Sequence, residues 1–330
     1  MLKPYHQIII FSIFGLIIGI LLFKIMIPLL HQFKFGQSIR KEGPTRHFEK
    51  KGTPTMGGIV IVIITLVLFS CYLMGKNEKN ATIWLSSILL IIPFLGFSLI
   101  GFVDDFLIIV KKNNNGLSPR LKFLFQIIIS GLTYYLVLIL RNNNYLNFFG
   151  TPIDIAFLYG IVIIVGFAGA TNATNLTDGL DGLLAGCSMI TITGILIISI
   201  IKNNEIVTYF SLSILIAITC FSFFNLPKAS IFMGDVGSLA IGGAIFSMLI
   251  VLHMELLFLF FGFIYLIETI SVILQVWFFK KTKGERLFRM TPVHHHFELM
   301  GLKEEEIDII FWLITFIFTI IGIVLGVKVF

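Results

Sequence analysis

The chain has 330 residues, of which 57% are hydrophobic and only 13% are charged, and its mean hydropathy is +0.99. This balance excludes an ordinary soluble domain and indicates a protein that lies largely within a membrane. The net charge of +6 requires no nucleic-acid partner, because an excess of basic residues on one side of a membrane explains it.

Ten apolar runs are each long enough to cross a membrane as a helix. A helix needs about 20 apolar residues to span roughly 30 Å of hydrocarbon. We therefore expect an all-α polytopic membrane protein with about ten transmembrane helices, forming a single integral-membrane domain over residues 1–330. In chain order, the runs lie at residues 6–30, 57–75, 83–103, 121–140, 155–173, 183–201, 208–224, 237–254, 256–279 and 307–328.

The first run could be either a cleaved signal peptide or a retained helix. It is long, it lacks a small-residue cleavage site, and it carries Lys24 and Pro28 near its end. These features favour a retained membrane helix.

The three cysteines, Cys71, Cys187 and Cys220, all fall inside apolar runs and form no CxxC pair. This placement suggests neither a disulfide framework nor a zinc site. We expect all three to be small buried side chains.

The basic residues predict the orientation of the spans. By the positive-inside rule, the loops richest in Lys and Arg lie in the cytoplasm. Both termini then lie outside, and attraction to anionic lipid or substrate adds a further reason for the basic charge. The set that holds 17 of the 24 Lys and Arg residues comprises loops 31–56, 104–120, 174–182, 225–236 and 280–306, together with Lys122.

The acidic residues give a sharper signal, because five of the seven aspartates fall in three short segments on this predicted cytoplasmic face. A carboxylate at or inside a membrane is costly and indicates a functional site. The five residues are Asp104, Asp105, Asp178, Asp181 and Asp235.

The first acidic segment, GFVDDF (101–106), closes the third predicted span with two adjacent carboxylates. Adjacent side chains on a helix point about 100° apart. We therefore expect Asp104 and Asp105 to serve different partners, one facing a metal ion and the other a reacting group.

The second acidic segment, NATNLTDGLDG (172–182), carries an asparagine or an aspartate at every third position. A spacing of three keeps neighbours on roughly one helix face. Four such steps drift around a straight helix, so we expect a tightened or broken turn near Gly179 and Gly182. The four polar residues are Asn172, Asn175, Asp178 and Asp181.

The third acidic segment, NLPKASIFMGDVGS (225–238), places Asp235 between Gly234 and Gly237, just before an apolar run. The N–H groups at a helix start favour an anion such as phosphate. Across the three segments the ligand atoms are carboxylate and amide oxygens without cysteine, which favours Mg²⁺ or Mn²⁺ over zinc.

Two further loops on the predicted cytoplasmic face carry candidate binding residues. RKEGPTRHFEKKGTPTMGG (40–58) is basic and glycine-rich, and a solvated inside-positive loop explains it except for its closing KKGTPTMGG. MTPVHHHFELMG (290–301) holds three consecutive histidines, whose side chains diverge on a helix or a strand. Hydrogen bonding to phosphate or sugar is therefore favoured over three ligands for one metal ion.

Five of these motifs, in this order, carry a family resemblance: KKGTPTMGG, GFVDDF, NATNLTDGLDG, NLPKASIFMGDVGS and PVHHHFELMG. They resemble the bacterial phospho-N-acetylmuramoyl-pentapeptide-transferases, a branch of the polyprenyl-phosphate N-acetylhexosamine-1-phosphate transferases. The resemblance spans nearly the whole chain, and PVHHHFE resembles the muramoyl branch in particular.

The resemblance implies a dimeric, ten-helix enzyme of the bacterial cytoplasmic membrane with its active site at the cytoplasmic face. Such an enzyme moves phospho-N-acetylmuramoyl-pentapeptide from its UDP carrier to undecaprenyl phosphate, a membrane lipid. The products are lipid I and UMP, in the first membrane step of peptidoglycan synthesis. The implied cofactor is Mg²⁺, or alternatively Mn²⁺.

The resemblance also implies roles for single residues. Asp235 is expected to bind the metal ion, with Asn175 sharing it. Asp104 is expected to deprotonate, to orient or, in a two-step scheme, to accept phosphate covalently. Asp105, grouped with Asp104 and Asp235 as catalytic, is expected to support the metal, the nucleotide or the sugar. The implied substrate-binding residues are Lys50 and Lys122 for phosphate, Asn172, Asn175, Asp178 and Asp181 for nucleotide or sugar, Asn225 and Phe232 for uracil, and His294, His295 and His296 for diphosphate or sugar.

One position departs from the family pattern. The family usually reads DDxxK, but here Ile108 stands where the lysine is expected. Lys111 and Lys112 follow the aspartate pair by seven residues, which returns each to nearly the same helix face. We expect Lys111, or else Lys112, to supply the missing charge, although both could equally be anchors at the cytoplasmic surface.

Two rival functions remain open on the sequence. A secondary transporter also places polar residues on broken helices, but near the bilayer midplane and between repeated halves. A related enzyme that transfers N-acetylglucosamine-1-phosphate to a polyprenyl phosphate is the nearer rival, and the histidine motif argues against it.

Overall fold

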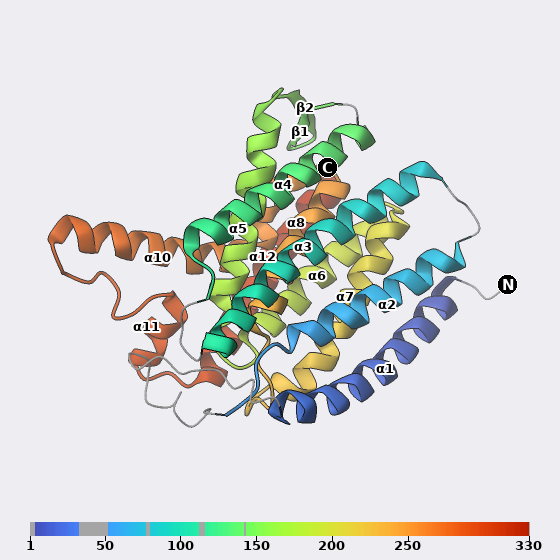
Figure 1. Cartoon of the computed structure of the whole chain (residues 1–330). Helices are drawn as coiled ribbons and strands as arrows, with labels where there is room; N and C mark the ends of the chain where they lie inside the picture. Colours follow the sequence, from blue (N-terminus) through green and yellow to red (C-terminus); the bar gives the residue numbers. More distant parts are fainter. Residues whose placement is uncertain (1–3, 33–51, 77–79, 112–115, 142, 330) are drawn as a thin grey trace.

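The structure is a computed structural model that describes residues 4–32, 52–76, 80–111, 116–141 and 143–329. Most of these residues are helical (Figure 1). The elements are α1 (Pro4–Gln32), α2 (Gly58–Gly75), α3 (Ala81–Lys111), α4 (Pro119–Arg141), β1 (Tyr145–Phe148), β2 (Thr151–Asp154), α5 (Leu158–Thr177), α6 (Leu183–Ile201), α7 (Glu205–Asn225), α8 (Gly234–Val251), the 3₁₀ helix η2 (Glu255–Leu257), α9 (Phe258–Phe261), α10 (Phe263–Thr282), α11 (Val293–Leu299) and α12 (Glu304–Lys328).

Ten of the described helices are long and apolar enough to cross a membrane, which confirms the predicted all-α polytopic fold. Both ends of the chain and the β1–β2 hairpin lie at one end of the bundle, whereas α11 lies at the other end (Figure 1). This arrangement agrees with the predicted even number of spans. The assignment of the α11 end to the cytoplasm stays a prediction.

Helix α8 forms the centre of the bundle. Every residue from Val236 to Val251 is buried, and α3, α5 and α2 pack around this helix. Glycines permit the close approach. A Cβ atom on Gly101 of α3 would overlap the carbonyl oxygen of Asp235, and one on Gly58 of α2 would overlap the backbone of Gly237. Because the two aspartates of α3 follow Gly101 by one turn, this packing brings them to the start of α8.

The outer faces of the bundle expose rows of large apolar side chains, as expected for helices that contact lipid. On α1 the exposed row includes Ile10, Phe14 and Leu21. The expectation that all three cysteines are buried is wrong for Cys71, which is exposed on α2, whereas Cys187 and Cys220 are buried. Cys71 lies on a face of its helix that no other described helix covers.

Two element boundaries differ from the predicted spans in ways that affect the site. The third span does not end at residue 103, because α3 continues to Lys111 through the apolar residues that follow the aspartates. The ninth span is not one helix over 256–279. It is divided into η2, α9 and α10, and Gly262 separates the last two. Helix α10 projects away from the other helices (Figure 1).

A short antiparallel hairpin, which the sequence did not predict, connects α4 to α5. Tyr145 of β1 pairs with Asp154 of β2, and Phe148 pairs with Thr151. The hairpin is remote from the acidic segments (Figure 1).

Candidate active site

The two adjacent aspartates of α3 are both buried and point to different partners, as their 100° separation predicts. Asp104 accepts a hydrogen bond from the backbone N–H of Leu117, at 2.6 Å. Asp105 instead accepts a hydrogen bond from the backbone N–H of Val236, at 3.3 Å, in the first turn of α8. The Asp105 carboxylate therefore ties α3 to α8, while that of Asp104 faces the start of α4.

Asp235, in the first turn of α8, contacts polar side chains from α4 and α5. The Lys122 ammonium lies 2.6 Å from Asp235 Oδ2 and 3.7 Å from Asp104 Oδ2. Lys122 belongs to the first turn of α4. Three helices thus place two carboxylates around a single positive charge, the ammonium of Lys122.

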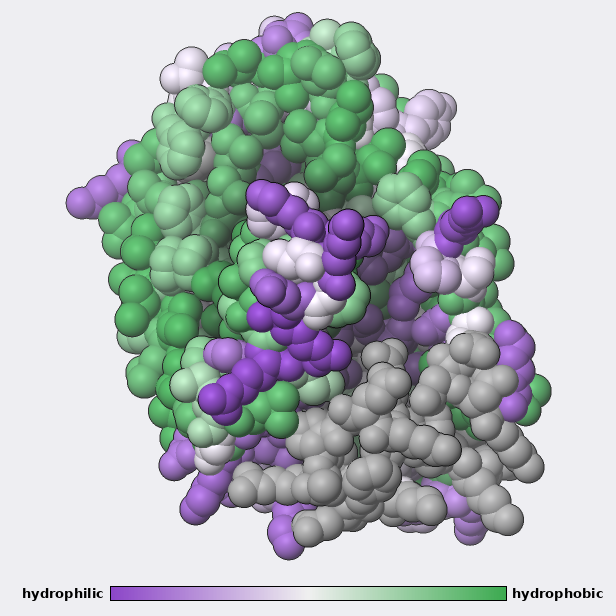
Figure 2. Space-filling model, turned by 90° about the vertical axis from the view of Figure 1, so that its left-hand side faces the viewer, coloured by the Kyte–Doolittle hydropathy of each residue, from purple (hydrophilic) through white to green (hydrophobic). Residues whose placement is uncertain are grey.

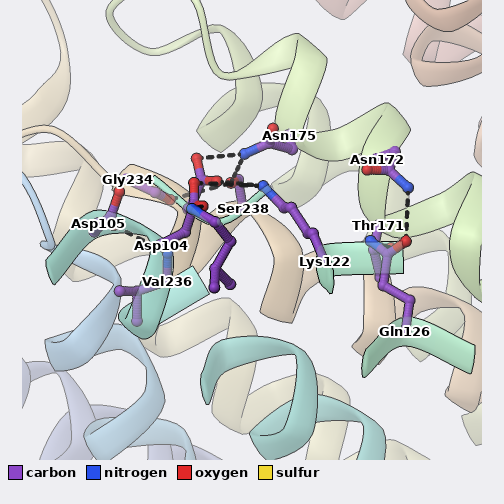
Figure 3. A network of polar contacts seen from close by, with 12 residues as sticks. Asp104, Asp105, Lys122, Gln126, Thr171, Asn172, Asn175, Gly234, Val236 and Ser238 are labelled. Atoms are coloured by element: carbon purple, nitrogen blue, oxygen red, sulfur yellow. Dashed lines mark hydrogen bonds and ion pairs between the residues drawn. The ribbon is translucent and has the colours of Figure 1, made fainter. Parts of the chain in front are cut away.

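Of the two asparagines of α5, one joins this cluster and the other does not (Figure 3). Asn175 Nδ2 donates to Asp235 Oδ1 at 2.7 Å and to Ser238 Oγ at 2.9 Å. Asn172 turns toward α4 instead, where its Nδ2 donates to Gln126 Oε1 at 3.1 Å. The structure therefore places Asn172 beside the cluster and holds its amide away from the carboxylates.

The chain turns between α5 and α6, where Asp178 and Asp181 lie. The predicted break is confirmed, because α5 ends at Thr177 and Gly182 adopts a left-handed conformation with φ of 86°. Burial, and then the carboxylates of Asp235 and Asp105, raise the pKa of Asp178 well above its usual range. This accumulation of negative charge favours a bound cation or a cationic side chain.

The loop before α8 packs on this turn. Asn225 Oδ1 accepts from the backbone N–H of Gly182 at 2.9 Å, and Asn225 Nδ2 donates to the Ile231 carbonyl at 2.9 Å. Asp181 is buried, and its Oδ2 accepts from the backbone N–H of Ala229 at 3.1 Å. Both side chains thus hold the loop and the turn together.

The Phe232 backbone pairs with the loop that precedes α2. Its N–H donates to the Pro54 carbonyl at 2.8 Å, and its carbonyl accepts from the Gly57 N–H at 2.9 Å. The Phe232 ring is partly exposed. The segment before α2 therefore forms one wall of the same site.

The three histidines lie on α11 and have three different contacts, so their predicted divergence is confirmed. His294 is buried, with Nδ1 3.1 Å from Glu268 Oε1 of α10. His295 Nδ1 lies 2.6 Å from Glu298 Oε2. His296 Nδ1 accepts from the backbone N–H of Arg289 at 3.1 Å. Only His295 and His296 are partly exposed.

The structure describes only one of the three lysines Lys50, Lys111 and Lys112. Lys50 and Lys112 lie outside the described residues. Lys111 is exposed at the end of α3, and Ile108 is partly buried one turn before it. The proposed compensation for the lysine that is absent at Ile108 stays a prediction.

The donor set fits a hard divalent cation. Asp235 and Asp104 offer carboxylate oxygens, Asn175 an amide oxygen and Ser238 a hydroxyl, and the ammonium of Lys122 already occupies a cation position between the two carboxylates. Within the described part of the chain, no three acidic, histidine or cysteine side chains converge as a ready-made ligand set. A divalent ion here would therefore take its remaining ligands from substrate phosphate and water, as Mg²⁺ usually does.

Two polar residues that support the site, Gln126 and Ser238, were not predicted from the sequence, although their spacing indicates them. Gln126 follows Lys122 by four residues and Ser238 follows Asp235 by three, so each lies on the same helix face one turn later. Glu268 was also not predicted as a site residue, although an acidic residue inside an apolar span indicates a functional site.

Hydrophilic side chains gather over a hollowed part of the face from which α10 projects, and hydrophobic side chains cover much of the surface above and beside them (Figure 2).

Comparison with known proteins identifies the family. Residues 87–253 match the profile of Glycosyl transferase family 4, and residues 50–62 match the phospho-N-acetylmuramoyl-pentapeptide-transferase signature 1. The chain is 40% identical over 327 residues to the phospho-N-acetylmuramoyl-pentapeptide-transferases of Staphylococcus aureus strains MSSA476, MW2 and JH9, covering 98% of this chain and 100% of each relative. The chain belongs to the phospho-N-acetylmuramoyl-pentapeptide-transferase family.

Membership of this transferase family and the ten spans make the chain a multi-pass protein of the bacterial cytoplasmic membrane. The family signature ends inside α2 and includes the segment that pairs with Phe232. The part of the signature that the structure describes therefore lies at the site.

Proposed function

We propose that the chain transfers phospho-N-acetylmuramoyl-pentapeptide from its UDP carrier to undecaprenyl phosphate, giving lipid I and UMP. The observation that supports this most is the Lys122 ammonium between the carboxylates of Asp235 and Asp104, brought together by three helices at one end of the bundle. A water-soluble nucleotide and a lipid phosphate can meet only at such a membrane edge. Their phosphate groups repel each other unless positive charge lies between them.

Asp235 is proposed to hold Mg²⁺, or Mn²⁺ in its place, with Asn175 sharing the ion after its amide turns its oxygen inward. When bound, the ion neutralises the diphosphate and stabilises the charge that develops on the departing UMP. Lys122 lies beside the carboxylates of Asp104 and Asp235 and is proposed to bind a phosphate oxygen. The dependence on a metal ion is supported here by the donor set alone.

The acceptor phosphate is proposed to attack directly. A phosphomonoester, with a second pKa of about 6, is largely a dianion at neutral pH and needs little help from a base. Its oxygen forms a bond to the phosphorus next to the sugar, and the bond from that phosphorus to the UMP oxygen breaks. Asp104 then orients the reacting phosphates, with Asp105 holding α3 against α8. A two-step scheme with a phosphorylated Asp104 remains the alternative.

The nucleotide is proposed to bind on the side of the α5–α6 turn. Asp178 and Asp181 lie on this turn, with Asn172 on the last turns of α5. The Phe232 ring offers a stacking face for uracil, and Asn225 fixes the loop that carries it. His295 and His296 are proposed to bind the diphosphate or the sugar. Lys50 is also proposed to bind phosphate, on the family resemblance alone, as is the assembly of two chains into a homodimer.

The rival donor is a UDP-linked N-acetylglucosamine, used by related enzymes of the wider superfamily. Purified protein in undecaprenyl-phosphate vesicles should release UMP from the muramoyl-pentapeptide donor and form a lipid-linked product. It should release little from UDP-N-acetylglucosamine. Preference for the second donor would overturn the proposed substrate while leaving the reaction class intact.

A further inference from the structure

A carboxylate and an imidazole form a buried pair behind the α5–α6 turn. Glu268 of α10 and His294 of α11 are both 0% exposed, and Glu268 Oε1 lies 3.1 Å from His294 Nδ1. The two groups lie within ion-pair distance, and among the described residues neither carboxylate oxygen and neither ring nitrogen has a partner that meets hydrogen-bond geometry. A carboxylate at this position favours a proton on Nδ1, which fixes the tautomer and the orientation of the ring.

The far edge of the same imidazole contacts the turn itself. A Cβ atom on Gly179 would overlap His294 Nε2, so the ring lies directly against the backbone of this glycine. Gly179 follows Asp178 and precedes Asp181 by two residues. The imidazole therefore lies between Glu268 of α10 and the backbone segment that carries Asp178 and Asp181.

Other groups also hold the turn. The Gly182 N–H donates to Asn225, and Asp181 accepts from the Ala229 N–H. Between the ends of α5 and α6 the backbone is not helical, so its position depends on the groups packed against it. The loop before α8 supplies some of these groups, and the Glu268–His294 pair supplies another.

The pair is not explained by packing alone. Burying a carboxylate with one imidazole partner costs more than burying two apolar side chains of similar size. Such a pair instead fixes the orientation of the imidazole ring, as carboxylates do when they orient functional histidines. At this site the oriented group is the ring that supports the turn.

We propose that Glu268 is a positioning residue, which holds the His294 imidazole against Gly179 and so sets the position of the Asp178 and Asp181 carboxylates for the UDP-linked donor. This proposal rests on the proposed function, in which that turn faces the nucleotide. Glu268, in the broken ninth span, then has a positioning role at the site. His294 has a role distinct from those of His295 and His296.

The test measures kcat and KM separately for the UDP-linked donor and for undecaprenyl phosphate. Glu268→Leu should lower kcat/KM for the donor by about 10- to 100-fold, the usual range for removing an orienting carboxylate. The KM for undecaprenyl phosphate should not change. Glu268→Gln keeps a carbonyl oxygen that can accept from Nδ1–H, and it should restore donor kinetics to within about 3-fold of wild type. A loss of packing alone would not separate the two substrates in this way.

A double-mutant cycle tests whether Glu268 acts through His294. If it does, the double variant Glu268→Leu/His294→Ala should be no worse than His294→Ala alone. Glu255→Gln is the matched control, because it changes a buried carboxylate paired with Arg141 in another part of the bundle. This control should leave the donor KM unchanged.

Additive losses in the cycle, or a wild-type donor KM in Glu268→Leu, would overturn the positioning role. If Glu268→Leu fails to fold, Gly179→Ala tests the same contact, because its methyl group would displace the ring and should raise the donor KM. An unchanged KM in Gly179→Ala would then overturn the proposal. If the wild-type protein itself does not use the donor, the proposed function fails first, and the role of the pair fails with it.

Discussion

Asp235 lies between two polar side chains of other helices, Lys122 of α4 and Asn175 of α5. Its two oxygens are held separately, Oδ2 by Lys122 and Oδ1 by Asn175. Replacing one oxygen with an NH₂ group preserves the shape but removes the negative charge that the Lys122 ammonium and a divalent ion require. The residue therefore allows the charge to be tested with little change in volume.

Asp235→Asn should lower kcat by at least about 10²-fold, comparable with the loss of a main electrostatic stabiliser of a transition state. The measurement is the rate of UMP release at saturating Mg²⁺. Asp154→Asn makes the same chemical change in the exposed hairpin and should leave the rate unchanged. Near-normal turnover of Asp235→Asn would remove Asp235 from the metal site.

At the scale of elements, the site depends on how closely α3 approaches α8. Gly101 is the point of contact, because its missing side chain leaves room for the Asp235 carbonyl. Asp104 and Asp105 follow on the next turn, so a change in helix separation here moves both carboxylates relative to Asp235.

Gly101→Ala should therefore destabilise the protein by about 1–3 kcal/mol, as overpacking does, and should lower turnover in the fraction that stays folded. Gly131→Ala on α4 is the matched control, because a Cβ there has no described atom within 4 Å. It should be neutral or stabilising by up to about 1 kcal/mol. Thermal unfolding and UMP release would measure the two effects. Equal behaviour of the two alanine variants would contradict the close approach of α3 and α8.

Hydropathy predicts the existence of the helices but not where they end or break. The apolar residues after Asp105 let α3 continue to Lys111, but a hydropathy window ends a span at the first charges it meets. The break before α10 is equally invisible, because Phe261 and Phe263 on either side of Gly262 are as apolar as any span. The broken turn at Gly182 was predictable, because a three-residue repeat cannot stay on one face of a straight helix.

At the scale of the whole molecule, the sequence predicted that the acidic segments share one face, and the structure brings Asp104, Asp105 and Asp235 together. Composition and span parity were sufficient for that prediction. They could not show that Asn172 turns toward Gln126 or that His294 is buried against Glu268, because these contacts join segments whose relative rotation no spacing rule specifies.

The central claim is that this cluster faces the cytoplasm, where UDP-linked sugars are available. The most direct measurement is labelling of single introduced cysteines in intact cells with a membrane-impermeant thiol reagent. Asn143→Cys, beside the hairpin, should be labelled, and Lys283→Cys, just after α10, should be labelled only after the membrane is opened. The chain without an introduced cysteine measures the background from Cys71, Cys187 and Cys220. The opposite pattern would place the carboxylates outside the cell and would contradict the proposed function.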